Sequence, residues 1–357
     1  MPDRATARPA DARQFLAAFA HSGHLRRLYP HATADRLDPR VLRELLACAD
    51  THREVGPVLS LCVHLATAVP LLAEGARTTT ATTYLEAAVR GERLLALAAT
   101  DEGAGSDPTA LTTTVGPGPR GLVLNGRKRW VTSAATADAA LVLARRTAGR
   151  HFTSFSWILV PLDAPGVSVR PADTDLFRGS GLGHIALEGV ELSSEYLVGR
   201  QGAGLVMFAK HLTVERLASA AWAIEVCRRT IEDTDQRLRE RAVGGGVLRE
   251  LSAVQQRLAE CAVRVSALDA LWRQTCDRIA AARDGTWAAV LKSASGLTIG
   301  QVLADCAQLQ GADGFERGGV QSLRAEAAVF GIGGGTTEVT LGIVAEHLDS
   351  VLSGVRP

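Results

Sequence analysis

The stretch Thr100–Asp107, which reads TDEGAGSD, lies where the spacing of apolar residues changes in this chain of 357 residues. Before it, from Pro39 to Arg93, Ala- and Leu-rich runs with apolar spacings of three and four predict helices. After it, up to about Leu197, short β-type runs alternate with Gly and Pro. From Gly204 onward the helical spacing returns. The sequence therefore predicts the order helical, β, helical.

The expected elements follow from these periods. Helices are predicted over residues 40–48, 56–73 and 82–90, and four longer ones, forming a C-terminal four-helix bundle, over 205–239, 251–283, 288–310 and 338–352. Strands are predicted over residues 122–124, 129–132, 140–144, 154–160, 167–170 and 184–187. Asn125–Gly126 predicts a hairpin turn, and Gly244–Gly246 a flexible break. We expect an α+β fold with domains over residues 1–95, 96–200 and 201–357.

Composition narrows the classes of function. Lys plus Arg is 39 and Asp plus Glu is 38, without a long block of one sign, so we expect no nucleic-acid partner. The longest apolar stretch, Val58–Leu72, is interrupted by His64 and is too short to span a bilayer, and the N-terminus lacks a signal pattern. We expect a soluble cytoplasmic protein without a membrane partner. Six scattered cysteines without a CxxC pair predict buried free thiols and no metal site.

Five motifs, in order along the chain, carry a resemblance to a known family. Thr100–Asp107 resembles the TEPGAGSD motif of acyl-CoA dehydrogenases, with only its second and third positions different. Leu124–Thr132 resembles that family's LNGxKxWxT strand, and Arg178–Ser180 the close of its β domain. Gln308–Gly314 resembles QxxGGxG, and Gly334–Glu338 resembles GGTxE at the start of the last helix. The resemblance covers roughly residues 60–350 and implies an acyl-CoA dehydrogenase-like fold with N-terminal helices, a central β domain and a C-terminal bundle.

The resemblance also implies FAD as the cofactor. Thr100 and Ser106 would face the pyrimidine edge of the flavin ring, Thr132 would sit near the hydride-accepting N5, and Trp130 would pack against the ring, with a strand-core role as the alternative. The resemblance places Ser106 beside the substrate as well. Further cofactor contacts are carried over to Gly105, Arg241, Gln308, Gly311, Thr336 and Glu338.

The reaction of such enzymes needs a carboxylate that removes the proton α to the thioester. Many family members place this Glu immediately before the Gly-Thr of the last helix, where this chain has Gly334. The isovaleryl and long-chain types carry it instead in a helix sequence like LxxERLxxA, which the stretch Leu212–Ala220 resembles with Glu215 as the base. The alternative for Glu215 is an exposed carboxylate paired with a neighbouring Arg. Arg216 is carried over as a polar neighbour of the substrate, with a solvated helix Arg as its alternative.

Some positions depart from the family pattern. The segment that clasps the adenine of a neighbouring subunit's FAD reads RxxFGxxL…Q, and here Arg241 is kept while Gly244 replaces Phe and Ser252 replaces Gln. A lost stacking contact costs about 1 kcal/mol, which weakens binding without abolishing it. Only about a hundred residues precede Thr100, fewer than usual, and an open pocket wall would suit a short or carrier-tethered acyl group.

Three functions remain open at this stage. The first is FAD-dependent α,β-dehydrogenation of a short acyl thioester, on CoA or an acyl carrier protein, by a biosynthetic homo-oligomer that passes electrons to an electron-transfer flavoprotein or to oxygen. The second is a flavin-dependent monooxygenase of the same fold, which Glu215 speaks against and the altered adenine clasp favours. The third is a partner subunit that completes the flavin site of a hetero-oligomeric acyl-CoA dehydrogenase.

Overall fold

A computed structural model describes residues 11–30, 36–105, 107–147, 149 and 151–354 of the chain. The chain divides into two compact units, Met1–Glu215 and Arg216–Pro357, and the division falls inside one long helix. The sequence boundaries at 95/96 and 200/201 remain predictions, because compactness alone does not separate a helical layer from a sheet that it packs on.

The first unit begins with helices, and side chains at their N-termini cap several of them. The helix α3 (Pro39–Asp50) starts where the Asp38 carboxylate accepts hydrogen bonds from the backbone N–H groups of Arg40 and Val41, with Pro39 in the first turn. The predicted helix over 56–73 is continuous but contains a π-helical turn. The helices of this layer are α1 (Ala12–His21) and α2 (His24–Leu28), which the sequence did not predict, α3, α4 (Val55–Val63), η1 (His64–Ala68), α5 (Val69–Gly75) and α6 (Thr79–Val89).

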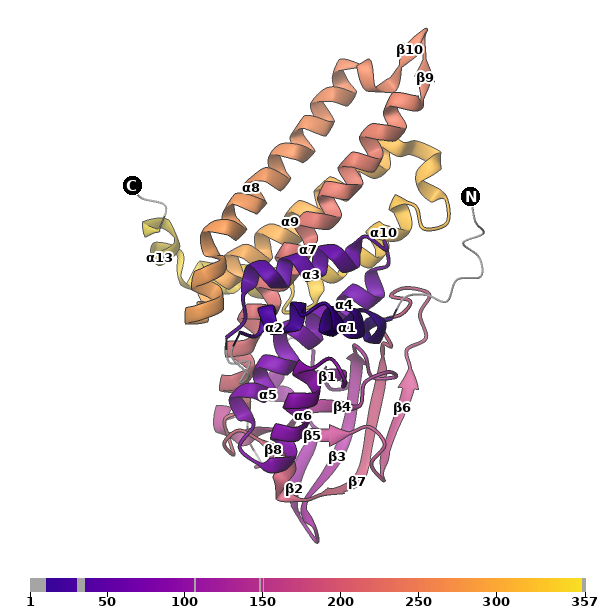
Figure 1. Cartoon of the computed structure of the whole chain (residues 1–357). Coiled ribbons are helices and arrows are strands. Elements are labelled where there is room, and N and C mark those ends of the chain that lie inside the picture. The colour runs from indigo at the N-terminus through magenta and orange to yellow at the C-terminus, as the bar shows by residue number, and fades with distance from the viewer. Residues whose placement is uncertain (1–10, 31–35, 106, 148, 150, 355–357) are drawn as a thin grey trace. The chain divides into compact units, whose positions relative to one another are not determined.

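The first unit also contains an eight-stranded sheet in the order β6-β7-β3-β2-β4-β5-β8, with β1 paired in parallel to β4 (Figure 1). Its central strands β4 and β5 are almost wholly buried, which explains their continuous apolar runs. The strands are β1 (Leu95–Ala98), β2 (Thr114–Gly118), β3 (Gly121–Val131), β4 (Ala139–Arg145), β5 (Phe155–Pro161), β6 (Val167–Pro171), β7 (Gly183–Leu192) and β8 (Leu197–Val198), with 3₁₀ turns at Pro108–Ala110, Phe152–Ser154 and Ser194–Tyr196.

The hairpin turn predicted at Asn125–Gly126 is wrong. Strands β2 and β3 pair from Thr114↔Asn125 to Gly118↔Gly121, so the turn between them lies at residues 119–120. Gly126 lies inside β3 at a shift in the pairing with β7, and its φ of 149° with Thr113 packed against it leaves no space for a side chain. The Asn–Gly pair therefore marks a β-bulge rather than a reversal of the chain.

The motif Arg178–Ser180 packs on the start of α4. The Ser60 hydroxyl donates to the Ser180 carbonyl at 2.9 Å, and a Cβ at Gly56 would collide with the backbone carbonyls of Phe177 and Arg178. We expect Gly56→Ala to lower the free energy of unfolding by about 1–3 kcal/mol, because backbone cannot yield as a flexible side chain does. Thermal unfolding tests this against Gly285→Ala, where a Cβ meets nothing within 4 Å. Equal melting temperatures for the two variants would show that this close approach has no energetic weight.

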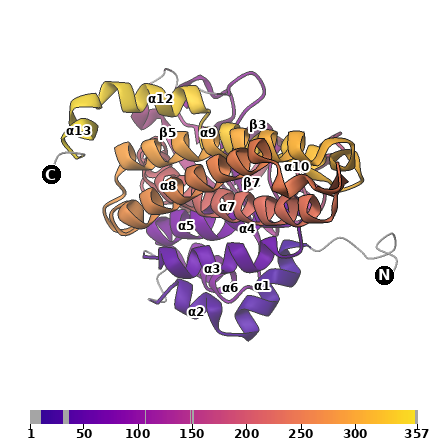
Figure 2. The same cartoon turned by 90° about the horizontal axis from the view of Figure 1, so that it is seen from above.

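The second unit is helical. Trp272 of α8 (Ser252–Ala282) donates its indole N–H to the Leu217 carbonyl of α7 (Gly204–Glu240) at 3.2 Å, and Trp222 packs on Phe330 with ring centroids 4.7 Å apart. Figure 2 shows α8 alongside α9 (Gly285–Gln310). The predicted helix over 338–352 is two helices, α12 (Thr337–Glu346) and α13 (Leu348–Ser353). The short helices α10 (Val320–Ala327) and α11 (Val329–Ile332) were not predicted, and 3₁₀ turns lie at Leu248–Glu250 and Gly311–Phe315.

The predicted flexible break at Gly244–Gly246 is an ordered hairpin. The strands β9 (Ala242–Val243) and β10 (Gly246–Val247) pair antiparallel, and Gly244 and Gly245 form the two-residue turn with φ of 56° and 89°. Two successive positive φ values are what a type I′ turn requires, and two glycines supply them without strain. The position where the family pattern has Phe is therefore a turn residue here.

Two further predictions concern the cysteines and the apolar segments. Five cysteines are buried free thiols, but Cys48 is exposed on α3, so the prediction is wrong for that residue. Two segments have the length and composition of a membrane span, Val55–Gly75 and Val320–Glu346. The first is 94% buried as a core helix of the first unit, and the second is divided into α10, α11 and α12.

Candidate active site

A buried ion pair joins the first two sequence motifs. Lys128 Nζ lies 2.5 Å from Asp101 Oδ1, both side chains are fully buried, and Lys128 also donates to the Leu143 carbonyl at 2.6 Å. Asp101 accepts further bonds from the backbone N–H groups of Thr112 and Thr113. Burial lowers the pKa of Lys128 to about 8 while Asp101 counteracts that effect. Burial alone would raise the pKa of Asp101, but Lys128 and Thr113 hold it below its usual value.

From the motifs alone, Asp101 is only a departure from the family pattern, and Lys128 is not singled out. The signal was present, since an acid follows Thr100 directly and a lysine stands inside the second motif. The structure shows that these two charges fix residues 100–104 against β3, where Thr100 accepts from the Arg129 N–H at 3.0 Å.

Trp130 occupies an unusual position at the end of β3. Its φ is 54°, a left-handed conformation that costs a non-glycine residue about 1–2 kcal/mol, and it lies at a shift in the pairing of β3 with β7. Its side chain is 54% exposed, so the strand-core alternative is wrong. His184 accepts from the Trp130 N–H at 3.2 Å and packs edge-on against the indole, with ring centroids 5.2 Å apart. The bulge thus turns a large aromatic face outward and His184 holds it there.

The turn after Trp130 contains Thr132, half-buried, followed by Ser133. The Ser133 and Ala135 N–H groups donate at 2.9 Å each to the carbonyls of Ser180 and Gly181, so the second motif is fastened to the third. The Ser133 side-chain oxygen is buried and has no hydrogen-bond partner among the described residues. A buried hydroxyl without a partner is costly, which points to a polar group that the protein alone does not supply.

The backbone of the first motif is uncrowded at Gly105. A Cβ at Gly105 would meet no heavy atom within 4 Å, and Gly103 has a φ of 84° in the preceding turn. Ser106, carried over as a cofactor and substrate contact, lies outside the described residues.

Glu215 lies on α7 and is half-buried. Its Oε2 accepts a hydrogen bond of 2.8 Å from the hydroxyl of Thr67 in η1, and Thr67 is fully buried. The alternative of an exposed helix carboxylate is therefore wrong. Thr67 could not be predicted as a partner of Glu215, because nothing in the motifs connects residues 67 and 215.

Arg216 is also buried, with 5% of its surface exposed, which contradicts its interpretation as a solvated helix arginine. Its Nε donates to the Gly334 carbonyl at 2.9 Å, and a Cβ at Gly335 would lie 3.2 Å from its Nη2. Gly334 and Gly335 have φ of 75° and 100°. A glutamate at Gly334, where many family members place the base, would be strained in this backbone.

The remaining predicted cofactor residues lie in the second unit at two places. Arg241 Nη1 donates to the Gln310 carbonyl at 3.4 Å beside Gly311, whose φ is 62°, while Gln308 is exposed one turn earlier on α9. Thr336 caps α12 by accepting from the Val339 N–H at 3.3 Å, and Glu338 is exposed in its first turn.

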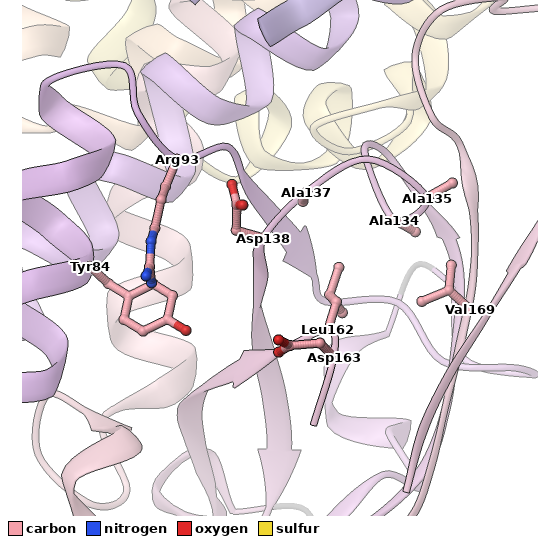
Figure 3. Close-up of a pocket in the computed structure, with 9 residues that line it drawn as sticks. All are labelled: Tyr84, Arg93, Ala134, Ala135, Ala137, Asp138, Leu162, Asp163 and Val169. Carbon is pink, nitrogen blue, oxygen red and sulfur yellow. The ribbon is translucent and has the colours of Figure 1, made fainter. Parts of the chain in front are cut away.

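A cavity of about 410 Å³ opens in the first unit between α6 and the sheet (Figure 3). Arg93 stacks on Tyr84 at 4.0 Å, and Asp138 accepts from the Leu94 N–H at 2.7 Å and pairs with Arg13 at 3.0 Å. None of the predicted site residues lines this cavity. Among the residues that the structure describes, no group of three or more His, Cys, Asp or Glu is placed to hold a metal ion.

A second carboxylate contacts the start of α7. Glu74 at the end of α5 lies 2.7 Å from His211 Nε2 and 2.9 Å from Lys210 Nζ. The hydrogen bond from His211, followed by that from Lys210, lowers the pKa of Glu74 from 4.5 to about 2 although burial opposes this.

We expect Glu74 to make folding stability depend on pH. A carboxylate with a depressed native pKa stabilises the fold above its unfolded pKa, and the contribution is lost as pH falls from 4.5 towards about 2. Unfolding midpoints in urea over this range should fall more steeply for the wild type than for Glu74→Gln. Glu44→Gln, at a carboxylate 56% exposed, is the control and should keep the wild-type slope. Parallel curves for the wild type and Glu74→Gln would contradict the assignment.

Comparison with known families decides what these motifs belong to. Residues 96–190 match the family description "Acyl-CoA dehydrogenase, middle domain", and residues 202–348 match "Acyl-CoA dehydrogenase, C-terminal domain". The chain belongs to the acyl-CoA dehydrogenase family. It is therefore a flavin oxidoreductase of that FAD-dependent family, with the fold that the resemblance implied.

Individual relatives are distant. A 3-(aryl)acrylate reductase of Clostridium sporogenes is 26% identical over 272 residues, which cover 74% of this chain and 71% of the relative. An L-prolyl-[peptidyl-carrier protein] dehydrogenase of a Serratia strain is 26% identical over 259 residues, covering 72% and 66%. The crystal structure of an acyl-CoA dehydrogenase from Geobacillus kaustophilus superimposes with a TM-score of 0.85 at 22% identity, covering 94% of this chain and 90% of that one. This last likeness shows the fold alone.

The described residues of this member of the family fit the family's cofactor, FAD. An outward-facing indole, an unpartnered buried hydroxyl and the open space at Gly105 are suited to a planar ring with one polar edge. In the second unit, the Arg241 guanidinium lies beside the left-handed Gly311, where a Cβ would come within 3.3 Å of Arg241 Nη1, and a guanidinium suits a phosphate-containing group.

Proposed function

We propose that this chain removes two hydrogens from the α and β carbons of a short acyl thioester, giving the α,β-unsaturated thioester, with Glu215 as the base. The observation that carries this proposal is the half-buried Glu215 carboxylate held by Thr67, combined with left-handed glycines at the alternative position of the base. A coarser statement, acyl-thioester dehydrogenation with FAD, follows from the family itself.

The site residues have distinct roles in this proposal. Bound FAD supplies the acceptor for the hydride from the β carbon. Trp130 and Thr132 would pack against and hydrogen-bond the ring, and Thr100, Gly105 and Ser106 are proposed to face its polar edge. The remainder of the cofactor would be held by Arg241, Gln308, Gly311, Thr336 and Glu338. Glu215 takes the proton from the α carbon, and the electron pair of that Cα–H bond forms the new double bond to the β carbon as the β carbon gives up its hydride.

The acyl group and its carrier belong to the proposal as well. The name of the Serratia relative points to a carrier-protein thioester, and a short-chain specific acyl-CoA dehydrogenase of Bos taurus is 26% identical over 265 residues. We therefore propose a short acyl group on CoA or an acyl carrier protein, in a cytoplasmic biosynthetic reaction. Arg216, which holds the loop at Gly334, is proposed as a polar neighbour of the substrate. The electron acceptor is an electron-transfer flavoprotein or oxygen.

A homo-oligomer is part of this proposal. The second unit exposes large apolar side chains on α11, α12 and α13. They are Ile332, Val339, Leu341, Leu348 and Leu352. Exposed apolar patches often mark surfaces that a partner covers. A second copy of the chain, which family members use as their neighbour, would cover them.

The partner-subunit function remains a second candidate because of the β9–β10 hairpin. Its two-glycine turn presents no aromatic side chain where the family pattern has Phe. A homo-oligomer that stays yellow through purification would favour the autonomous enzyme over a subunit that depends on a different partner.

The test of the proposed function is a single turnover without oxygen. Protein loaded with FAD is mixed with butyryl-CoA or with butyryl-loaded acyl carrier protein, and the visible flavin band is followed. Bleaching with formation of the crotonyl thioester is expected. If neither thioester bleaches the flavin and a separate aerobic assay shows oxygen uptake that needs a flavin reductase, the monooxygenase is favoured instead.

A further inference from the structure

The helical segment Val55–Gly75 contains a π-helical turn, His64–Ala68, between two α-helices. The Val69 N–H donates to the His64 carbonyl, five residues back, in place of the usual four. Single π turns inside α-helices are rare and often lie at functional sites. This one is in the buried core of the first unit, and all five of its residues are buried.

The sequence accounts for this wider turn. Pro70 lies two residues after the turn, lacks an N–H group, and in a regular α-helix its ring would clash with the carbonyl of Ala66. A π turn before the proline relieves that clash and adds one residue to the turn. Since an α-helix rotates about 100° per residue, the added residue changes which side chain faces α7.

Neighbouring side chains fix the turn on both sides. The Tyr29 hydroxyl donates to the Leu65 carbonyl at 2.6 Å, and the His64 Nδ1 accepts from the Leu95 N–H at 3.1 Å. Burial lowers the pKa of His64 to about 4, so its ring is neutral near pH 7 and Nδ1 is available as an acceptor. The turn is therefore held by α2 and β1 rather than by its own hydrogen bonds alone.

Thr67 is the residue that this turn presents to α7. It has no exposed surface, and its hydroxyl donates to Glu215 Oε2 at 2.8 Å. Threonines of α7 itself, such as Thr230, donate to the backbone carbonyl one turn back in their own helix. This is the local arrangement expected of a helical threonine. Thr67 instead makes a charge-assisted bond to a carboxylate 148 residues away.

We propose that Thr67 is a positioning residue for Glu215: its hydroxyl, delivered by the π turn, fixes the orientation of the carboxylate that takes the α proton. This inference rests on the proposed function of Glu215. Removing the hydroxyl deletes one contact that orients the carboxylate, and proton transfer requires a defined approach to the C–H bond. The effect is expected on the rate of the chemical step and not on thioester binding.

The experiment uses FAD-loaded full-length protein and butyryl-CoA as the probe. Thr67→Val removes the hydroxyl with little change of shape, Thr67→Ser keeps it, and Thr230→Val removes a buried hydroxyl that bonds only to backbone. Anaerobic stopped-flow gives the limiting rate of flavin bleaching and the concentration for half-maximal rate. NMR of deuterium uptake at the α carbon reports proton removal separately, and melting temperatures report folding.

For Thr67→Val we expect a limiting rate about 10- to 100-fold lower, with the half-saturating concentration changed less than about twofold. Deuterium uptake should slow in parallel. Thr67→Ser should recover most of the rate, and Thr230→Val should behave as the wild type. With Glu215→Asp, whose carboxylate does not reach as far, adding Thr67→Val should cost little more, because both changes break one contact.

The contradicting results are distinct. A wild-type limiting rate in Thr67→Val, or an equal loss in Thr67→Ser, overturns the role of Thr67 while leaving Glu215 as the base. Unchanged turnover in Glu215→Gln overturns the proposed function and this inference together. If Thr67→Val does not fold, Thr67→Ala compared with Thr67→Ser decides the same question.

Discussion

Lys128→Met is expected to lower the free energy of unfolding by about 3–5 kcal/mol, because it leaves the Asp101 carboxylate buried without its cation. Lys128 and Asp101 are both fully buried, so water does not replace the lost partner. The Leu143 carbonyl loses its donor as well. Chemical denaturation of the purified variant measures this loss.

Arg129→Met provides the matched control, since Arg129 is the next residue and pairs with Glu102 at 3.2 Å in an exposed position. Exposed pairs contribute about 0–1 kcal/mol, so this variant should be close to the wild type. The double variant Asp101→Asn/Lys128→Met should lose less than the sum of its single variants. Similar losses for Lys128→Met and Arg129→Met would show that the buried pair does not hold the two motifs together.

Glu215→Gln is expected to slow flavin bleaching by a short acyl thioester by about 10²- to 10⁴-fold, the usual contribution of a general base. The glutamine side chain has the same shape as glutamate, and its amide oxygen can accept the Thr67 hydrogen bond. The amide does not take up a proton near neutral pH. Flavin content and melting temperature should stay close to those of the wild type. The rate constant of anaerobic bleaching at saturating thioester is the measurement.

Glu232→Gln is the control for Glu215→Gln. Glu232 lies on the same helix α7 and pairs with Arg228 at 2.7 Å in an exposed position. Its replacement should leave bleaching unchanged. If Glu215→Gln bleaches as fast as Glu232→Gln, another group takes the α proton and the base has been assigned wrongly.

The fold could be predicted from the sequence where patterns are long or motifs specific. The order helical, β, helical and the long helices α7, α8 and α9 follow from periodicity, because each buries an apolar face of many residues. The short helices α1, α2, α10 and α11 give too few turns for a period to appear. Asn125–Gly126 misled because the same dipeptide serves a turn and a bulge, and only the pairing with β7 distinguishes them.

The candidate site was predictable where the family motif names residues and not where contacts join distant segments. Trp130 and Glu215 come from motifs; the structure shows an exposed indole and a half-buried carboxylate, and their roles in flavin binding and catalysis stay predictions. Thr67 depends on a π turn, which no propensity scale anticipates. The burial of Arg216 depends on a loop 118 residues away, so its helix position alone suggested a solvated side chain. Such long-range partners appear only when the chain is folded.

The most direct test of the account is the visible spectrum of the chain purified alone, loaded with FAD, desalted and then mixed without oxygen with butyryl-CoA. The account predicts a flavin band that survives desalting and bleaches as the unsaturated thioester forms. A protein that stays colourless after loading, or whose band persists with every short acyl thioester on CoA or carrier protein, would contradict autonomous acyl-thioester dehydrogenation by this chain.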